Sequence, residues 1–69
     1  MNRTKNLRKL IGKRGLTLSI LRPSGFVLIE GESYDCQGTR PWIIEEGASV
    51  IVTGVLMDRF LQVREIGVQ

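Results

Sequence analysis

Residues 16–29 read LTLSILRPSGFVLI, which is two β-rich runs on either side of a proline and a glycine. Apolar and polar residues alternate over 16–20, and 26–29 is a continuous apolar run of the kind found in strands. Proline favours the second position of a turn and glycine the fourth, so Arg22-Pro23-Ser24-Gly25 predicts a type I turn. The stretch therefore predicts two strands joined by a tight turn.

Three more strands are expected after this pair. They cover residues 33–37, 49–56 and 60–65, with a turn at Gly31, a long connection over 38–47 and a short one over 57–59. Many short strands with frequent turn signals favour a barrel or a sandwich. Closing one sheet on itself removes exposed strand edges, so an all-β, five-stranded OB-fold-like barrel is the expected architecture. Before it, residues 6–13 are expected to form a short lead-in with at most a turn of helix.

Composition excludes most enzyme chemistry. The chain has 69 residues, enough for one domain, with a single cysteine, Cys36, and no histidine. An intramolecular disulfide, a cysteine/histidine zinc site and a nucleophile with an imidazole base are therefore ruled out. The acidic pair Glu45-Glu46 lies in no recognised calcium loop and is expected to be solvated. We expect no catalytic residue, no metal and no cofactor, and hence a non-catalytic binding module.

Charge divides the chain unevenly. The acids all lie from Glu30 onward, whereas residues 1–14 hold only basic charges: Arg3, Lys5, Arg8, Lys9, Lys13 and Arg14. Three interpretations stay open for them: a solvated terminus, a membrane-proximal segment attracted to anionic lipid, or a contact with nucleic acid phosphates. No stretch is apolar for long enough to cross a bilayer. The expected organisation is a flexible basic segment or linker over 1–14 and a barrel over 15–66.

The ordered turn and core markers resemble the C-terminal soluble domain of NfeD proteins, over roughly residues 11–65. The markers are Gly15, Leu21-Arg22-Pro23-Ser24-Gly25, Val27, Ile29, Gly31, Tyr34, Cys36, Ile44, Gly47, Val50, Val52, Val55, Leu61 and Val63. The resemblance implies an OB-fold in which the helix between strands three and four is reduced, as the short 38–47 connection allows. NfeD domains usually follow transmembrane helices and sometimes a serine protease domain of the ClpP class, whose catalytic serine has no counterpart here.

The resemblance also implies partners and a location. NfeD genes often neighbour those of stomatin- or flotillin-like membrane proteins, and the domain is thought to serve protein interaction in membrane-protein quality control. The leading expectation is therefore an interaction module that acts with such a partner or with a membrane protease. It would be a cytoplasmic-side domain brought near the membrane by an upstream segment, with self-association possible.

The register of the first strand decides which apolar residues are available to a partner. Simple alternation would bury Leu16, Leu18 and Ile20, whereas the resemblance implies that Thr17, Ser19 and Leu21 point inward. A one-residue shift exchanges the two faces of a strand. In the implied register an apolar surface faces outward, unless the lead-in covers it through its apolar residues Leu7, Leu10 and Ile11. The candidate partner surface comprises Leu16, Leu18, Ile20, Phe26, Leu28 and Trp42.

Two alternatives remain. Trp42 either closes one end of the barrel as a buried cap or anchors a partner from the long connection, while Ile44 is expected in the core. The alternative function is a single-stranded nucleic-acid-binding OB-fold. Its signal is weak because the few aromatic residues are not interleaved with cations, so no nucleic acid partner is expected.

Overall fold

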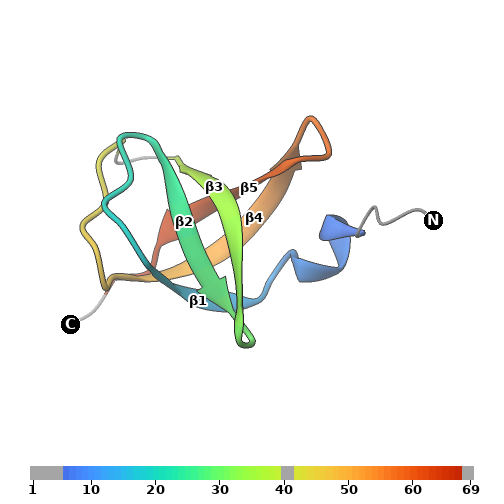
Figure 1. The fold of residues 1–69 in the computed structure, drawn as a ribbon, viewed down its shortest axis with the longest axis horizontal. Helices are drawn as coiled ribbons and strands as arrows, with labels where there is room; N and C mark the ends of the chain where they lie inside the picture. Colours follow the sequence, from blue (N-terminus) through green and yellow to red (C-terminus); the bar gives the residue numbers. More distant parts are fainter. Residues whose placement is uncertain (1–5, 40–41, 68–69) are drawn as a thin grey trace.

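A closed five-stranded barrel forms the body of the protein (Figure 1). The computed structural model describes residues 6–39 and 42–67. Its elements are the 3-10 helix η1 (Leu7–Leu10) and the strands β1 (Arg14–Thr17), β2 (Ser24–Ile29), β3 (Glu32–Gly38), β4 (Ser49–Leu56) and β5 (Phe60–Glu65). The strands close in the order β1-β2-β3-β5-β4, with β3 and β5 parallel and every other pair antiparallel. The expectation of an all-β, OB-fold-like barrel is confirmed.

The barrel interior is filled by alternate residues of all the longer strands. Side chains that are at most 1% exposed are Leu21, Val27, Ile29, Cys36, Ile44, Val50, Val52, Leu61 and Val63. Thr17 is the buried polar residue among the described positions, at 2% exposure. Its hydroxyl donates to the carbonyl of Glu45 at 2.6 Å and accepts the N–H of Ala48 at 2.9 Å, so it is buried without an unmet hydrogen bond. The expected core position of Ile44 is confirmed.

The turn between β2 and β3 is as short as a hairpin allows. Glu30 and Gly31 join Ile29 to Glu32, and both have positive φ, at 53° and 86°. Positive φ at both central residues is the requirement of a type I′ turn, whose twist matches that of the flanking strands. The turn predicted at Gly31 is confirmed.

The first strand is shorter than its sequence pattern predicts. A strand over 16–21 is expected, but β1 covers Arg14–Thr17, and the chain rejoins the sheet only at the isolated bridge between Leu21 and Ile44. Between these points the hydroxyl of Ser19 accepts the N–H of Phe26 at 3.2 Å. A side chain thus takes the place of a backbone acceptor, and the segment leaves the ladder.

The predicted type I turn over 22–25 is also wrong. Ser24 and Gly25 already belong to β2, where they pair with Gln37 and Cys36 of β3. The Arg22–Pro23 peptide bond is cis, and the carbonyl of Pro23 accepts the N–H of Gly38 at 2.7 Å. The pairing of β2 with β3 therefore begins at Ser24, two residues earlier than the predicted turn would allow.

The lead-in packs against the barrel. The η1 helix begins after Asn6, whose side chain accepts the N–H of Arg8 at 3.1 Å, and it contacts β4. Leu7 and Leu10 are half-buried and lie against the core. Of the expected basic segment, Arg3 and Lys5 lie outside the described residues.

Candidate functional site

The register of β1 against β2 decides which side chains face outward. Thr17 pairs with Val27 and both point inward, whereas Leu16 pairs with Leu28 on the outside. Leu21 is fully buried and Ser19 half-buried, so the register implied by the family resemblance is correct and simple alternation is wrong.

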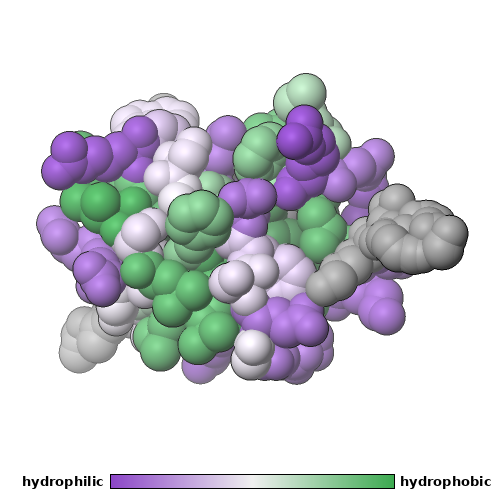
Figure 2. Space-filling model, viewed as in Figure 1, coloured by the Kyte–Doolittle hydropathy of each residue, from purple (hydrophilic) through white to green (hydrophobic). Residues whose placement is uncertain are grey.

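Five apolar side chains from β1, the segment after it and β2 form one continuous surface, which we call the β1–β2 outer face. It consists of Leu16, Leu18, Ile20, Phe26 and Leu28. The exposed fractions of Leu16, Leu18 and Phe26 are 47%, 43% and 49%, and the other two are half-buried. Figure 2 shows apolar side chains gathered over β2 and the neighbouring segment. The structure therefore brings the predicted strand residues together on one face.

Polar residues border this face on both sides. In the ladder, Leu28 lies opposite Ser33 and Phe26 lies opposite Asp35 of β3. On the other side, Leu16 lies opposite Ser49 of β4. Directly opposite residues share a face of the sheet, so the apolar area is two strands wide with a polar rim. An apolar centre with a polar rim is typical of protein interfaces.

Trp42 and Ile43 are two further exposed apolar residues, and they lie in the 42–48 connection. This connection runs antiparallel to residues 17–21, with the N–H of Leu21 donating to the carbonyl of Ile44 at 2.8 Å. Trp42 is 59% exposed, so its interpretation as a buried cap is wrong. Ile43 is 56% exposed and was missed by the sequence reasoning. The burial of Ile44 was the signal, because neighbours of an inward residue in an extended segment point outward.

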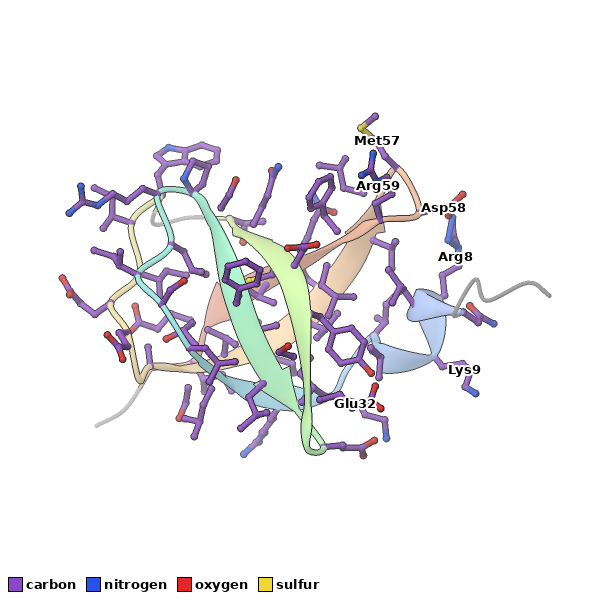
Figure 3. All side chains as sticks on the ribbon, viewed as in Figure 1. Arg8, Lys9, Glu32, Met57, Asp58 and Arg59 are labelled. Atoms are coloured by element: carbon purple, nitrogen blue, oxygen red, sulfur yellow. The ribbon has the colours of Figure 1, made fainter. Side chains whose placement is uncertain are left out.

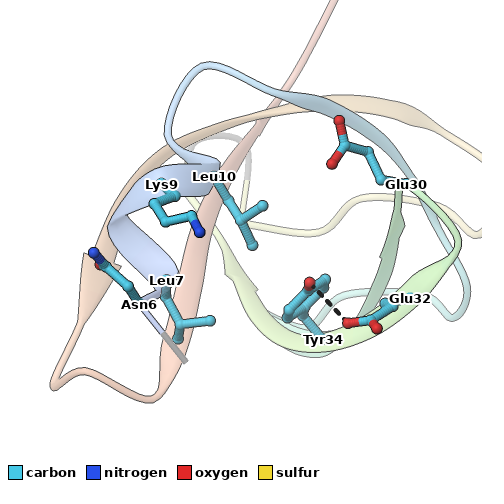
Figure 4. A pocket seen from close by; sticks show the side chains of 7 residues that line it. All are labelled: Asn6, Leu7, Lys9, Leu10, Glu30, Glu32 and Tyr34. Atoms are coloured by element: carbon cyan, nitrogen blue, oxygen red, sulfur yellow. Dashed lines mark hydrogen bonds between the residues drawn. The ribbon is translucent and has the colours of Figure 1, made fainter. Parts of the chain in front are cut away.

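The lead-in does not cover the β1–β2 outer face with any residue that the structure describes. Leu7 and Leu10 pack beside Tyr34 and β4 instead, and Ile11 is 47% exposed. Figure 4 shows η1 facing β3 across a pocket of about 450 Å³, in which Tyr34 donates a hydrogen bond to Glu32 at 3.1 Å. Of the two alternatives, coverage of the outward strand residues by the lead-in is therefore wrong for the described part of the chain.

The described basic residues do not gather in one patch. Arg8 reaches Asp58 in the β4–β5 turn at 3.5 Å, as Figure 3 shows, and Lys13 reaches Glu30 in the β2–β3 turn at 3.1 Å. Both pairs are exposed and so contribute little to stability. Their effect is to hold part of the positive charge against acidic turns of the barrel.

Chemical reactivity is low at the one thiol. Cys36 is fully buried, and desolvation, with a smaller contribution from the charge of Asp35, raises its pKa to about 12. A thiol with a raised pKa is a poor nucleophile and a poor metal ligand. Within residues 6–39 and 42–67, no three cysteine, aspartate or glutamate side chains lie close enough together to hold a metal ion. In the same residues, no helix has the length and apolar character needed to span a membrane.

Comparison with known proteins agrees with this description of the fold. Residues 7–55 match the family model for the NfeD-like C-terminal, partner-binding domain. Among solved structures, the C-terminal domain of stomatin operon partner protein 1510-C from Pyrococcus horikoshii is similar, with a TM-score of 0.83 and 26% sequence identity. The similarity covers 96% of this chain and 100% of that one. No curated protein sequence matches.

Proposed function

Because the chain belongs to the NfeD-like C-terminal, partner-binding domain family, we propose that it is a non-catalytic module that binds a stomatin- or flotillin-like membrane protein. A membrane protease is the second partner class, and membrane-protein quality control is the process in which both would act. The similar domain from Pyrococcus horikoshii comes from a stomatin operon partner protein, which supports the first class.

The observation that carries the proposal is the β1–β2 outer face. Soluble domains rarely expose large contiguous apolar areas unless something binds there. Leu16 and Phe26 are each nearly half exposed, although both lie in paired strands of the barrel. Aromatic residues at the centre of an apolar patch dominate the binding energy of many interfaces, so Phe26 is the expected anchor, with Trp42 extending it.

The basic lead-in supports a position close to a membrane. An upstream segment would tether the barrel on the cytoplasmic side, where positive residues are favoured next to a membrane span and anionic lipid attracts them. The membrane-proximal residues in this proposal are Arg3, Lys5, Arg8, Lys9, Lys13 and Arg14. Arg8 and Lys13 also form exposed ion pairs with Asp58 and Glu30 of the barrel, and Leu7 and Leu10 pack against its core, so the same segment would set the distance of the outer face from the bilayer.

The test replaces Phe26 and Leu28 with serine and measures binding to a stomatin-like protein held in nanodiscs. Loss of a central aromatic anchor is expected to raise the dissociation constant at least about tenfold. The control is Met57→Ser, which removes an apolar side chain that is 74% exposed in the β4–β5 turn, away from the face. Its affinity is expected to equal that of the parent chain.

Two outcomes would contradict this proposal. In one, the double variant loses most of its thermal stability and still binds; in the other, it binds as the Met57→Ser control does. Sedimentation of the parent and double variant in parallel shows whether the face joins copies of the chain instead. A membrane protease in the same nanodiscs tests the second partner class.

The nucleic-acid alternative is tested with single-stranded oligonucleotides over a range of salt concentrations. The carboxylate of Asp35 borders Phe26 on the outer face, and a negative charge beside a stacking platform opposes phosphate binding. We therefore expect that the oligonucleotides do not bind in the salt-sensitive way that is typical of phosphate contacts. Micromolar binding that falls steeply with salt would replace the partner proposal.

A further inference from the structure

The β3 strand is paired along only half of one edge. On one side it pairs with β2 from Glu32 to Gln37, but on the other it pairs with β5 only through Cys36, Gln37 and Gly38. The β5 strand begins at Phe60, whose neighbour Leu61 is the partner of Cys36, so it does not extend alongside the first part of β3. Beyond that point no described residue pairs with this edge of β3, and we call the space between it and η1 the seam.

The direction of the free backbone groups follows from the ladder. Gly38 donates to Pro23, and in an antiparallel pair the residues that bond to one neighbour alternate with those that face away. Glu32, Tyr34 and Cys36 therefore direct their backbone groups to β2. Ser33 and Asp35 direct theirs to the seam, where none of the described residues bonds to the N–H or C=O of Ser33 or to the N–H of Asp35.

A pocket lies directly beside this edge. It has a volume of about 450 Å³ and is lined by Leu7 and Leu10 of η1 and by Tyr34 and Glu32 of β3, with Asn6, Lys9 and Glu30 around it. Figure 4 shows that the leucine side chains and the Tyr34 ring point toward one another across the pocket. Because side chains alternate along a strand, a segment paired with β3 would place one side chain in this pocket and the next on the outside.

We propose that the open edge of β3, at Ser33 and Asp35, is a second binding site, which takes an extended peptide segment of a partner as an added strand. Backbone hydrogen bonds to these residues hold the segment, as in other cases of β-strand addition. An apolar side chain of the segment enters the pocket between η1 and β3. A basic side chain on the outside meets the exposed carboxylate of Asp35, since opposite charges on neighbouring strands attract.

This site adjoins the β1–β2 outer face, whose polar rim includes Ser33 and Asp35, but it uses a different chemistry. The outer face uses apolar side chains of β1 and β2, whereas the edge uses backbone groups of β3 on its far side from β2. A partner could therefore occupy both at once. The peptide site does not depend on the identity of the partner proposed above.

The first test is amide hydrogen exchange of the full chain, followed by NMR. In the free chain, the amides of Ser33 and Asp35 are expected to exchange at least about tenfold faster than those of Tyr34 and Cys36, which bond to β2. The probe is an acetylated hexapeptide in which valine alternates with lysine. Adding it is expected to slow exchange at Ser33 and Asp35 at least about tenfold, while Tyr34 and Cys36 change little.

Matched peptides and variants separate edge pairing from unspecific contact. The same hexapeptide with an N-methyl group on every residue has no N–H to donate and carries methyl groups along both edges, so it cannot form a ladder and is expected not to protect either amide. Ser33→Pro removes the N–H that faces the seam but leaves every hydrogen bond between β3 and β2 in place. Ser33→Ala keeps that N–H and is the matched control. Proline is expected to weaken binding at least about fivefold relative to alanine, with the two variants unfolding at similar temperatures.

The proposal is wrong if the hexapeptide and its N-methylated form protect the two amides equally. It is also wrong if both amides are already protected in the free chain and become fast when residues 1–5 are removed, because the site would then belong to the chain itself. If Ser33→Pro does not fold, the exchange comparison on the parent chain still decides between these outcomes. The Phe26/Leu28 double variant is expected to bind the hexapeptide as the parent does.

Discussion

At the scale of single residues, one hydroxyl connects β1 to the segment that leads into β4. Thr17 bonds to both Glu45 and Ala48, and this pair of bonds accounts for a polar side chain in a core that is otherwise apolar. A buried polar group costs stability unless it is bonded, so the threonine is tied to this one arrangement of the connection. Position 17 thus holds the 45–48 segment beside the β1–β2 outer face.

Cys36 makes the first prediction, which concerns pH. The folded chain raises the thiol pKa from 9.0 to about 12 through burial, so the neutral form is favoured in the folded state. Stability from this group is fully present below pH 9 and is lost as pH rises from about 9 to 12. In that window the free energy of unfolding should fall by about 1.4 kcal/mol per pH unit more than in Cys36→Ala.

Urea unfolding of the parent chain and Cys36→Ala at a series of pH values checks this. Tyrosine and lysine titrate in both proteins, so their contribution cancels in the comparison. Parallel curves from pH 8 to 11 would show that the thiol is not desolvated. Thiol-reactive reagents offer an independent measurement, since labelling at pH 8 should be far slower in buffer than in urea.

At the scale of elements, close approach of β1, β2 and the 18–21 segment depends on glycine. A Cβ at Gly25 would lie 2.5 Å from Leu21 and 2.6 Å from the hydroxyl of Ser19. A Cβ at Gly15 would lie 2.5 Å from the carbonyl of Leu28. These contacts are shorter than any packing tolerates, so the two glycines hold the strands at the separation that closes the barrel.

Gly25→Ala is the prediction for this scale. The added methyl group must displace Leu21 and the Ser19 bond to β2, and overpacking of this kind costs about 1–3 kcal/mol. Gly67→Ala is the matched control, because nothing lies within 4 Å of its added Cβ, and its effect should stay within about 0.5 kcal/mol. Thermal unfolding of both variants measures the difference. Equal melting temperatures would mean that Leu21 can move aside freely.

At the scale of the whole molecule, barrel closure leaves an inner face that is fully buried and an outer face that is partly apolar. The two faces alternate residue by residue along β2, with Val27 at 0% exposure and Phe26 at 49%. Of these two neighbours, the larger side chain, Phe26, is on the outer face and the smaller, Val27, is in the core. In the proposed function, stability and partner binding would therefore be carried by opposite faces of the same strand.

This arrangement predicts that, of two threonine variants, the one with the smaller change in side-chain size loses more unfolding free energy. Val27→Thr changes shape little but buries a hydroxyl in an apolar core, which costs about 1–3 kcal/mol. Phe26→Thr deletes a whole ring and is expected to cost less than about 1 kcal/mol, because half of that ring is already in water. Chemical denaturation of the two variants gives the order. A larger loss for Phe26→Thr would place the ring in the core and remove the basis for the outer face.

The sequence by itself determined the strands β4 and β5, the β2–β3 turn and the burial of Ile44, because propensity, glycine conformation and local alternation act over a few residues. For residues 16–21 the sequence pattern predicted that one set of alternate residues faces inward. Only the family resemblance indicated that this set is Thr17, Ser19 and Leu21. Tertiary structure alone decided that Trp42 and Ile43 are exposed, that the lead-in packs beside β3 and β4, and that, among the described residues, β5 pairs only with the last part of β3. The physical reason is that these outcomes depend on which distant segments meet when the sheet closes. Closure, and not local pattern, leaves the apolar outer face available to a partner.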